Sequence, residues 1–164
     1  MKVIDTERLS IELASDEYME QMIRDEKDEG LKQAYSEMLQ GAKANPNQRE
    51  WNAIWIVRLR ENPNISVGEI SFKGLSDLGV IEIGYGVQPG FERQGYMTEA
   101  VTGMVRWAGS QPEVRQIEAE TESENVASRR VLQKAGFVEN GVMGEEGPRF
   151  VWSGKNKSFI NLTY

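Results

Sequence analysis

Cysteine and histidine are both absent from this chain of 164 residues. Without cysteine the chain can form no disulfide, no thiolate zinc site and no cysteine nucleophile. Without histidine it has no Ser-His-Asp triad, no imidazole metal ligand and no histidine base. Any acid–base chemistry must therefore use carboxylates, tyrosines, serines, lysines or water, and no metal site is expected.

Long apolar runs and long basic runs are also absent. No stretch approaches the ~20 apolar residues that cross a bilayer, and the first residues, MKVIDTERL, lack the apolar core of a secretory signal. Nineteen basic residues against 26 acidic ones give a net charge of −7, which argues against binding to a nucleic-acid backbone. We therefore expect a cytoplasmic protein with no membrane and no nucleic-acid partner. The acidic surface favours a cationic partner such as an amine, or it serves only solubility.

The composition, with 39% hydrophobic and 27% charged residues, is that of an ordinary globular protein, and the length predicts one domain over residues 1–164. About seven strands are expected, at 8–13, 52–60, 65–73, 80–87, 114–121, 137–143 and 149–152, with about four helices, at 16–23, 31–42, 97–108 and 126–135. This order predicts an α+β fold, a mixed and mostly antiparallel sheet with helices on both faces. In the tail, residues 154–164, only the alternation of Ile160, Leu162 and Tyr164 resembles a strand.

The most informative segment runs from Val80 to Trp107 and reads VIEIGYGVQPGFERQGYMTEAVTGMVRW. On the period of two of a strand, Glu82, Gly84 and Gly86 point to one face and the apolar side chains point to the other. A glycine inside a strand gives up packing, so two of them indicate that something comes close to the backbone. The expected strand thus has an apolar face and a bare face that carries a single carboxylate.

The turn after this strand ends at Gly95 and leads into a helix with a buried apolar stripe. The first-turn N–H groups of a helix have no intrahelical partners, and the helix dipole favours negative charge there. This end of the helix is therefore a predicted anion site, suited to phosphate. A nucleotide-binding domain is a further interpretation, although G-x-G-x-x-G and a βαβ unit are absent.

Three ordered blocks of sequence carry a resemblance. They are TERLSIELA at 6–14, IEIGYGVQPGFERQGYMTEA at 81–100 and ENVASRRVLQKAGF at 124–137. Together they resemble the GNAT superfamily of acetyl-CoA-dependent N-acetyltransferases, in the branch of the ribosomal-protein acetyltransferases RimJ and RimL. The resemblance implies a GNAT-like fold, acetyl-CoA as cosubstrate, and a primary amine as acceptor, either a protein N-terminus or a small molecule. Which amine is used, and whether a homodimer forms, is left open.

The resemblance also implies which residues hold the coenzyme. In the family, backbone amides of a Gln/Arg-x-x-Gly-x-Gly/Ala loop bind the diphosphate, and this loop matches residues 92–97, with Glu92 in the first position. The coenzyme arm is expected to pair with the glycine-bearing strand like an added strand. A basic patch of Arg93, Arg129, Arg130 and Lys134 meets the phosphates or is only a solvated face. The expected cofactor-binding residues are Tyr85, Val87, Arg93, Gln94, Gly95, Tyr96, Met97, Thr98, Asn125, Ser128 and Arg130.

Acetyl transfer requires an unprotonated amine, whereas amines are mostly charged at pH 7. Glu82, on the bare face, is the predicted catalytic base, acting directly or through water, unless it is a solvated or salt-bridged carboxylate. Backbone N–H groups at Tyr85 and Val87 are expected to stabilise the tetrahedral intermediate.

The thiolate leaving group needs a proton. Many family members use a tyrosine seven positions after the asparagine of the last helix, and this position is Leu132 here. Ser128 is the predicted catalytic donor to the sulfur, with a water relay as an equal alternative. The missing tyrosine and Glu92 motivate a second hypothesis for the function, an acyl-CoA-binding module with little or no turnover.

Overall fold

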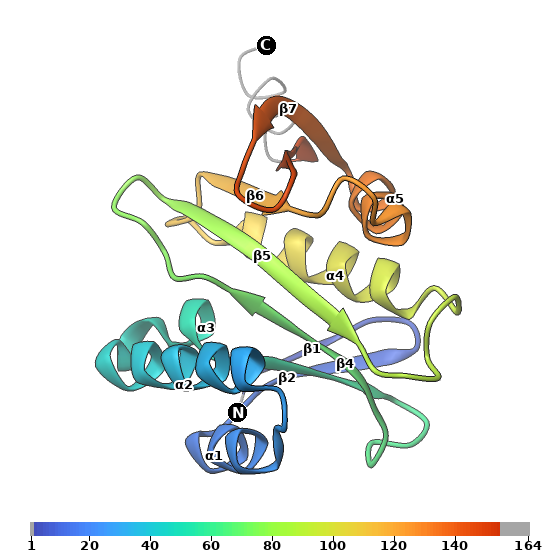
Figure 1. Cartoon of the computed structure of the whole chain (residues 1–164). Coiled ribbons are helices and arrows are strands. Elements are labelled where there is room, and N and C mark those ends of the chain that lie inside the picture. Colours follow the sequence, from blue (N-terminus) through green and yellow to red (C-terminus); the bar gives the residue numbers. More distant parts are fainter. Residues whose placement is uncertain (1, 155–164) are drawn as a thin grey trace.

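The computed structural model describes residues 2–154, which form one eight-stranded sheet in the order β1-β2-β3-β4-β5-β6-β8-β7 (Figure 1). The strands are β1 (Val3–Asp5), β2 (Leu9–Leu13), β3 (Trp55–Leu59), β4 (Ser66–Phe72), β5 (Val80–Val87), β6 (Gln116–Glu120), β7 (Phe137–Met143) and β8 (Pro148–Trp152). The helices are α1 (Asp16–Asp25), α2 (Glu29–Ala44), α3 (Arg49–Asn52), α4 (Tyr96–Ser110) and α5 (Val126–Ala135), with a 3₁₀ turn at Pro46–Gln48. The mixed, mostly antiparallel fold expected from the sequence is confirmed.

Helices cover both faces of the sheet. The apolar side of α1 and α2 packs on one face, where Met19, Tyr35 and Leu39 are buried against Ile54 and Ile56. The larger core lies on the other face, beneath α4 and α5 (Figure 1). Within residues 2–154, none of the helices has the length and apolarity that spanning a membrane requires.

The predicted helix ends are confirmed by their caps. Ser15 accepts a hydrogen bond from the Tyr18 N–H at the start of α1, and Asn125 accepts one from the Ser128 N–H at the start of α5. Gly136 ends α5 with φ at 102°, a left-handed conformation that glycine adopts without strain. Local side-chain chemistry was therefore sufficient to place these ends.

Two short elements were missed, so the described residues hold eight strands and five α-helices instead of about seven and four. Strand β1 pairs antiparallel with β2, from Val3 opposite Glu12 to Asp5 opposite Ser10. The strand expected from residue 52 begins at Trp55, because α3 precedes it. Trp51 of α3 is buried, with ring centroids 5.3 Å from Phe72 and 5.1 Å from Trp107. The strand expected through Ile160, Leu162 and Tyr164 lies outside the described residues.

Strands β5 and β6 separate along their length. They pair in parallel only from Val80 opposite Gln116 to Glu82 opposite Glu118, whereas β4 remains paired with β5 as far as Val87. Strand β6 ends at Glu120, two residues after its last pair with β5, and the chain then turns away into α5. In the described sheet, the half of β5 that carries both glycines therefore has a backbone edge that β6 does not cover.

Candidate functional site

The two glycines of β5 face unoccupied space. A Cβ atom built at Gly86 has no heavy atom within 4 Å, and one built at Gly84 meets only the Oγ atom of Ser71, at 3.4 Å. Gly68, on β4, differs because a Cβ there would overlap the carbonyl oxygen of Gly86. Packing thus requires glycine at 68 but not at 84 or 86. The bare face predicted for β5 is confirmed, because the space in front of Gly84 and Gly86 is open.

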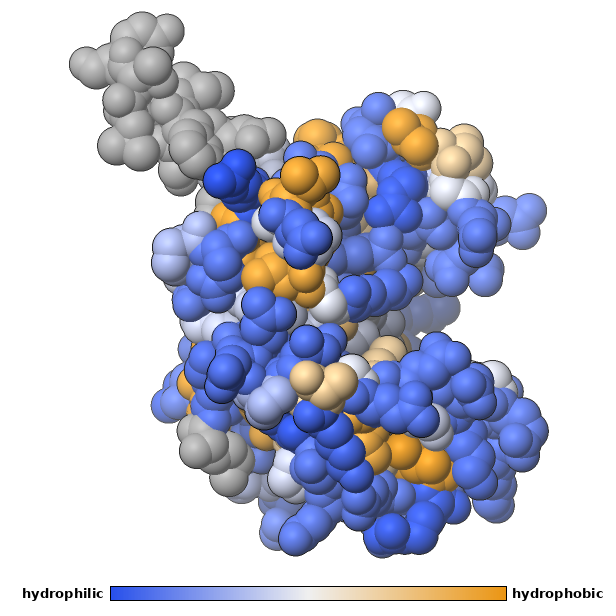
Figure 2. Space-filling model, turned by 90° about the vertical axis from the view of Figure 1, so that its left-hand side faces the viewer, coloured by the Kyte–Doolittle hydropathy of each residue, from blue (hydrophilic) through white to orange (hydrophobic). Residues whose placement is uncertain are grey.

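A cavity of about 330 Å³ lies where β5 and β6 separate. Its lining comes from the residue after β4, from β5, from the end of β6 and the segment between β6 and α5, from the first turn of α5, and from the turn before β8. It comprises Lys73, Ile83, Gly84, Tyr85, Glu120, Thr121, Glu122, Asn125, Ser128 and Glu146. At the height of β5 the molecular surface is notched on its right-hand side in Figure 2, between an upper and a lower mass of mostly hydrophilic surface. The structure thus brings predicted residues from two distant blocks to one cavity.

A tyrosine hydroxyl lies beside Ser128 in this cavity, but it comes from β5. The Tyr85 hydroxyl is 2.7 Å from Ser128 Oγ and also donates to the Ser128 carbonyl oxygen at 3.1 Å. Burial raises the pKa of Tyr85 to about 12, although its hydrogen bond with Ser128 lowers it. Leu132, where the family tyrosine was expected, is buried in the core. Tyr85, predicted as a backbone contributor, therefore also brings its phenol to Ser128.

The loop before α4 contains three residues with a left-handed backbone conformation. Gly90, Arg93 and Gly95 all have positive φ, at 91°, 63° and 78°, and no side chain caps the amino terminus of α4. The carboxylate of Glu92 accepts a hydrogen bond from the Gly90 N–H at 2.8 Å, so it is folded back onto its own loop. The first-turn N–H groups of α4 are thus left without a side-chain partner from the described loop.

Arg8 braces this loop, and no local pattern in the sequence predicted that role. Its guanidinium donates to Glu99 at 2.7 Å and to the carbonyl oxygen of Gln94 at 2.9 Å, and it lies 4.5 Å from the ring centroid of Tyr96. Burial would raise the pKa of Glu99, but hydrogen bonds from Thr6 and Arg8 outweigh it and lower that pKa. In a trans peptide the C=O and the next N–H point in opposite directions. Because Arg8 holds the carbonyl oxygen of Gln94, the N–H group of the next residue, Gly95, points away from Arg8.

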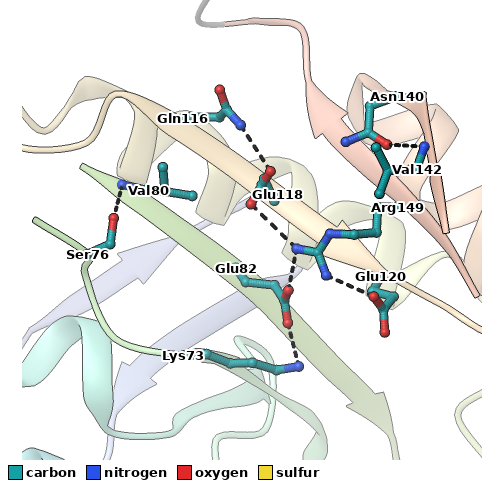
Figure 3. Close-up of polar contacts among 10 residues, drawn as sticks. All are labelled: Lys73, Ser76, Val80, Glu82, Gln116, Glu118, Glu120, Asn140, Val142 and Arg149. Atoms are coloured by element: carbon teal, nitrogen blue, oxygen red, sulfur yellow. Dashed lines mark hydrogen bonds and ion pairs between the residues drawn. The ribbon is translucent and has the colours of Figure 1, made fainter. Parts of the chain in front are cut away.

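Glu82 is a member of an ion-pair network instead of a free carboxylate (Figure 3). Its two oxygens lie 2.5 Å from Lys73 Nζ and 2.6 Å from Arg149 Nη2. Arg149 also pairs with Glu120 at 2.8 Å and with Glu118 at 3.4 Å. Burial would raise the pKa of Glu82, but the hydrogen bonds and charges of Lys73 and Arg149 outweigh it and lower that pKa. The salt-bridged state left open by the sequence is the one observed.

Of the remaining predicted cofactor residues, Val87 ends β5, Arg130 lies on α5, and residues 93–98 form the end of the loop before α4 and its first turn. Gly95 and Thr98 line a second cavity of about 600 Å³, which is flanked by Arg106 and Lys134. Arg93, Gln94 and Arg130 are exposed, and Val87 is 37% exposed. Tyr96 is half-buried, and Met97 turns its side chain into the core, so only its backbone can face a ligand.

The predicted basic patch is divided by the fold. Arg129 pairs with Glu139 at 2.6 Å and donates to the carbonyl oxygen of Ser123. Lys134 lines the larger cavity, whereas Arg130 is exposed on α5. The four cations expected to act together are thus distributed over different surroundings.

This chain is similar to known proteins in sequence and in fold. A family model described as acetyltransferase (GNAT) domain matches residues 1–138. The protein named uncharacterized N-acetyltransferase YjdG of Bacillus subtilis (strain 168) is 38% identical over 87 residues, 52% of this chain and 51% of its own length. The match thus spans about half the length of this curated relative.

Solved structures resemble the whole described fold. An acetyltransferase (GNAT family) from Bacillus anthracis is 22% identical with a TM-score of 0.65, covering 92% of this chain and 96% of its own. RimL, a ribosomal-protein acetyltransferase solved in complex with coenzyme A, is 16% identical with a TM-score of 0.71, at the same coverage. At such identities the likeness concerns the fold.

Proposed function

Because this chain belongs to the acetyltransferase (GNAT) domain family, we propose that it transfers an acetyl group from acetyl-CoA to a primary amine by direct attack on the thioester. The observation that carries this proposal is the uncovered edge of β5, with its two open glycines, next to an α4 amino terminus without a side-chain cap. The acceptor is a protein N-terminus or a small-molecule amine. Since one structural relative is named a ribosomal-protein acetyltransferase, peptide amino termini are the first acceptors to test.

The residues present fit acetyl-CoA. Its diphosphate would be held by backbone N–H groups of residues 93–98, and its arm would pair with β5 between Gly84 and Val87 as an added strand. Bound acetyl-CoA supplies an activated acyl group and a thiolate leaving group. Asn125 and Ser128 line the cavity that would receive the thioester end.

The protein's own groups then serve the transfer. Backbone N–H groups at Tyr85 and Val87 stabilise the negative oxygen of the tetrahedral intermediate. The Ser128 hydroxyl, which Tyr85 can orient, or a water molecule passes a proton to the departing sulfur. Glu82 was predicted as the base, but its two cationic partners favour the ionised form and weaken it as a proton acceptor.

Thiol release from acetyl-CoA with a panel of amines tests the proposal. We expect release that depends on both acetyl-CoA and an amine. Tight coenzyme binding without turnover on any amine would instead support the acyl-CoA-binding module. A ligand present at 100 times its Kd stabilises the folded protein by about 2.7 kcal/mol. A thermal-shift screen with different ligands therefore also discriminates between these functions. Stabilisation by NAD or ATP, with none by coenzyme A, would support a nucleotide-binding domain.

Replacing Arg8 by alanine is expected to raise the KM for acetyl-CoA about tenfold with little change in kcat, a loss of about 1.4 kcal/mol of binding. The reason is that the loop loses the donor that orients the peptide after Gln94. Steady-state kinetics with varied acetyl-CoA measures both constants. Arg60→Ala is the matched control, because Arg60 donates to the Thr6 carbonyl of the same hairpin. Equal KM values in the two variants would contradict the bracing role.

Replacing Tyr85 by phenylalanine is expected to lower kcat about tenfold and to leave coenzyme affinity unchanged. The variant keeps the ring but removes the hydroxyl that lies 2.7 Å from Ser128 Oγ. Because the two hydroxyls act together, the double variant with Ser128→Ala should lose little more than Ser128→Ala alone. Single-turnover rates and calorimetry separate the two effects, and additive losses would show that the hydroxyls act independently.

A further inference from the structure

Glu69 of β4 is a second carboxylate on the open face of β5. It lies directly opposite Gly86 in the antiparallel register, and directly opposed residues point to the same face with Cβ positions about 5 Å apart. A side chain at Gly86 is absent, and a Cβ there would have no neighbour within 4 Å. Glu69 therefore lies on the same face of the sheet as the bare glycines and Glu82.

The surroundings of Glu69 are neutral or acidic. Tyr35 of α2 donates a hydrogen bond of 2.6 Å to its Oε1 atom, and within residues 2–154 no cation pairs with this carboxylate. Glu26, which caps α1, contributes negative charge. On the neighbouring strands, the residues opposite Glu69 are Ile56 and Gly86, and neither carries charge. Glu69 is thus a half-buried carboxylate held by one phenol.

The pKa values of Glu69 and Glu82 are shifted in opposite directions. Burial raises the pKa of Glu69 above its usual range, against the lowering effect of the Tyr35 hydrogen bond and with a further rise from Glu26. Glu82, between Lys73 and Arg149, has a lowered pKa. Where one site holds two such groups, the one with the raised pKa is suited to exchange protons near neutral pH, and the other stays a fixed anion.

Resting on the proposed function, we propose that Glu69 is the catalytic residue that removes the proton from the acceptor ammonium, and that Tyr35 is a positioning residue that tunes it. The ammonium transfers one proton to the Glu69 carboxylate, leaving a neutral amine and a carboxylic acid. The amine lone pair forms the C–N bond while the carbonyl electron pair moves onto oxygen. When that pair returns, the C–S bond breaks. One of the two protons left on nitrogen passes to the thiolate through the Ser128 hydroxyl or a water molecule, the other stays as the amide N–H, and Glu69 releases its proton to water.

The test compares Glu69→Gln with Glu82→Gln, which removes a carboxylate from the same face. A hexapeptide with a free amino terminus and 1,4-diaminobutane serve as acceptors, and thiol release gives kcat/KM from about pH 5 to about pH 9. Wild-type kcat/KM should rise with pH through the pKa of Glu69. Glu69→Gln should lower it by about 10²-fold and remove this rising limb, whereas Glu82→Gln should keep the limb.

The pH profile of Tyr35→Phe is a measurement that would not change if Tyr35 had only a structural role. It removes the hydrogen bond that lowers the pKa of Glu69, so the rising limb should move to higher pH. Carbon-13 NMR titration of the glutamate carboxyl groups in the acceptor-free protein should show Glu69 titrating above Glu82, and further above it in Tyr35→Phe. A limb that is unmoved in Tyr35→Phe, or retained in Glu69→Gln, would overturn the assignment.

Failure of the inference can be told from failure of the proposed function. A wild-type protein that binds acetyl-CoA by calorimetry but acetylates neither amine would overturn the proposed function and this inference with it. A wild-type protein that acetylates an amine, with an unchanged pH profile in Glu69→Gln, would overturn the inference alone.

Discussion

Replacing Gly86 by valine is expected to lower acetyl transfer by about 10³-fold while the fold stays intact, since a displacement of about 1 Å in a reacting pair already costs about 10²-fold. The open space over Gly86 accommodates a Cβ without contact, and valine is favoured over glycine in a strand. The added side chain would occupy the space in which thioester and amine meet. Thiol release measures the loss, and urea unfolding checks that stability is kept.

Gly68→Ala is the matched control for this variant, because it adds a smaller side chain at a glycine of the neighbouring strand β4, opposite Val87. The new Cβ would overlap the Gly86 carbonyl oxygen and lie 2.8 Å from Met97 Cε. Overpacking of this kind destabilises by about 1–3 kcal/mol, so this variant should lose stability, whereas Gly86→Val should keep its stability and lose activity. Wild-type turnover in Gly86→Val would show that the reaction does not use the space over the glycines.

Replacing Arg149 by methionine is expected to destabilise the fold by about 2–3 kcal/mol at pH 7, below the value for a fully buried pair because the network is partly exposed. The change leaves Glu82, Glu118 and Glu120 close together, with Lys73 the one cation still bonded to Glu82 in the network described (Figure 3). Methionine keeps much of the aliphatic part of the arginine side chain, so the loss of stability reflects the removal of the charge. Urea unfolding at constant pH measures it.

The pH dependence of this loss has a defined sign. The folded pKa of Glu82 is lowered, so its contribution to stability is present above the unfolded pKa of about 4.3 and is lost as pH falls through the folded value. Without Arg149 the carboxylates accept protons more readily, and the deficit of the variant should shrink below about pH 4. Lys73→Met is the control, since its side chain is 56% exposed and its loss should cost less than about 1 kcal/mol. Equal losses in both variants, or a deficit independent of pH, would contradict the central role of Arg149.

The parts of the fold that the sequence predicted well are those with strong local signals. Helices with an apolar stripe, a capping residue such as Ser15 or a terminal glycine such as Gly136 were found near their observed ends. The short elements β1 and α3 were missed because distant residues stabilise them. Three residues of β1 depend on pairing with β2, and α3 depends on the burial of Trp51 against Phe72 and Trp107.

The candidate site followed the same division. The period of two predicted that Glu82 and both glycines share a face, and it predicted that Tyr85 points to the other. It could not predict that Arg149, 67 positions away, binds Glu82, or that Tyr85 reaches Ser128 across 43 positions. The contact of Arg8 with Glu99 spans 91 positions, and Tyr35 reaches Glu69 across 34.

The amino-acid sequence by itself determined the order of the main elements, the bare glycine face of β5 and the resemblance to acetyltransferases, because each depends on residues that are neighbours along one strand, one helix or one loop. The tertiary structure alone decided which carboxylate is held by cations and which by a phenol. Proton affinity depends on burial and on charges within a few ångströms, and these surroundings are assembled from strands and helices that lie far apart in the chain.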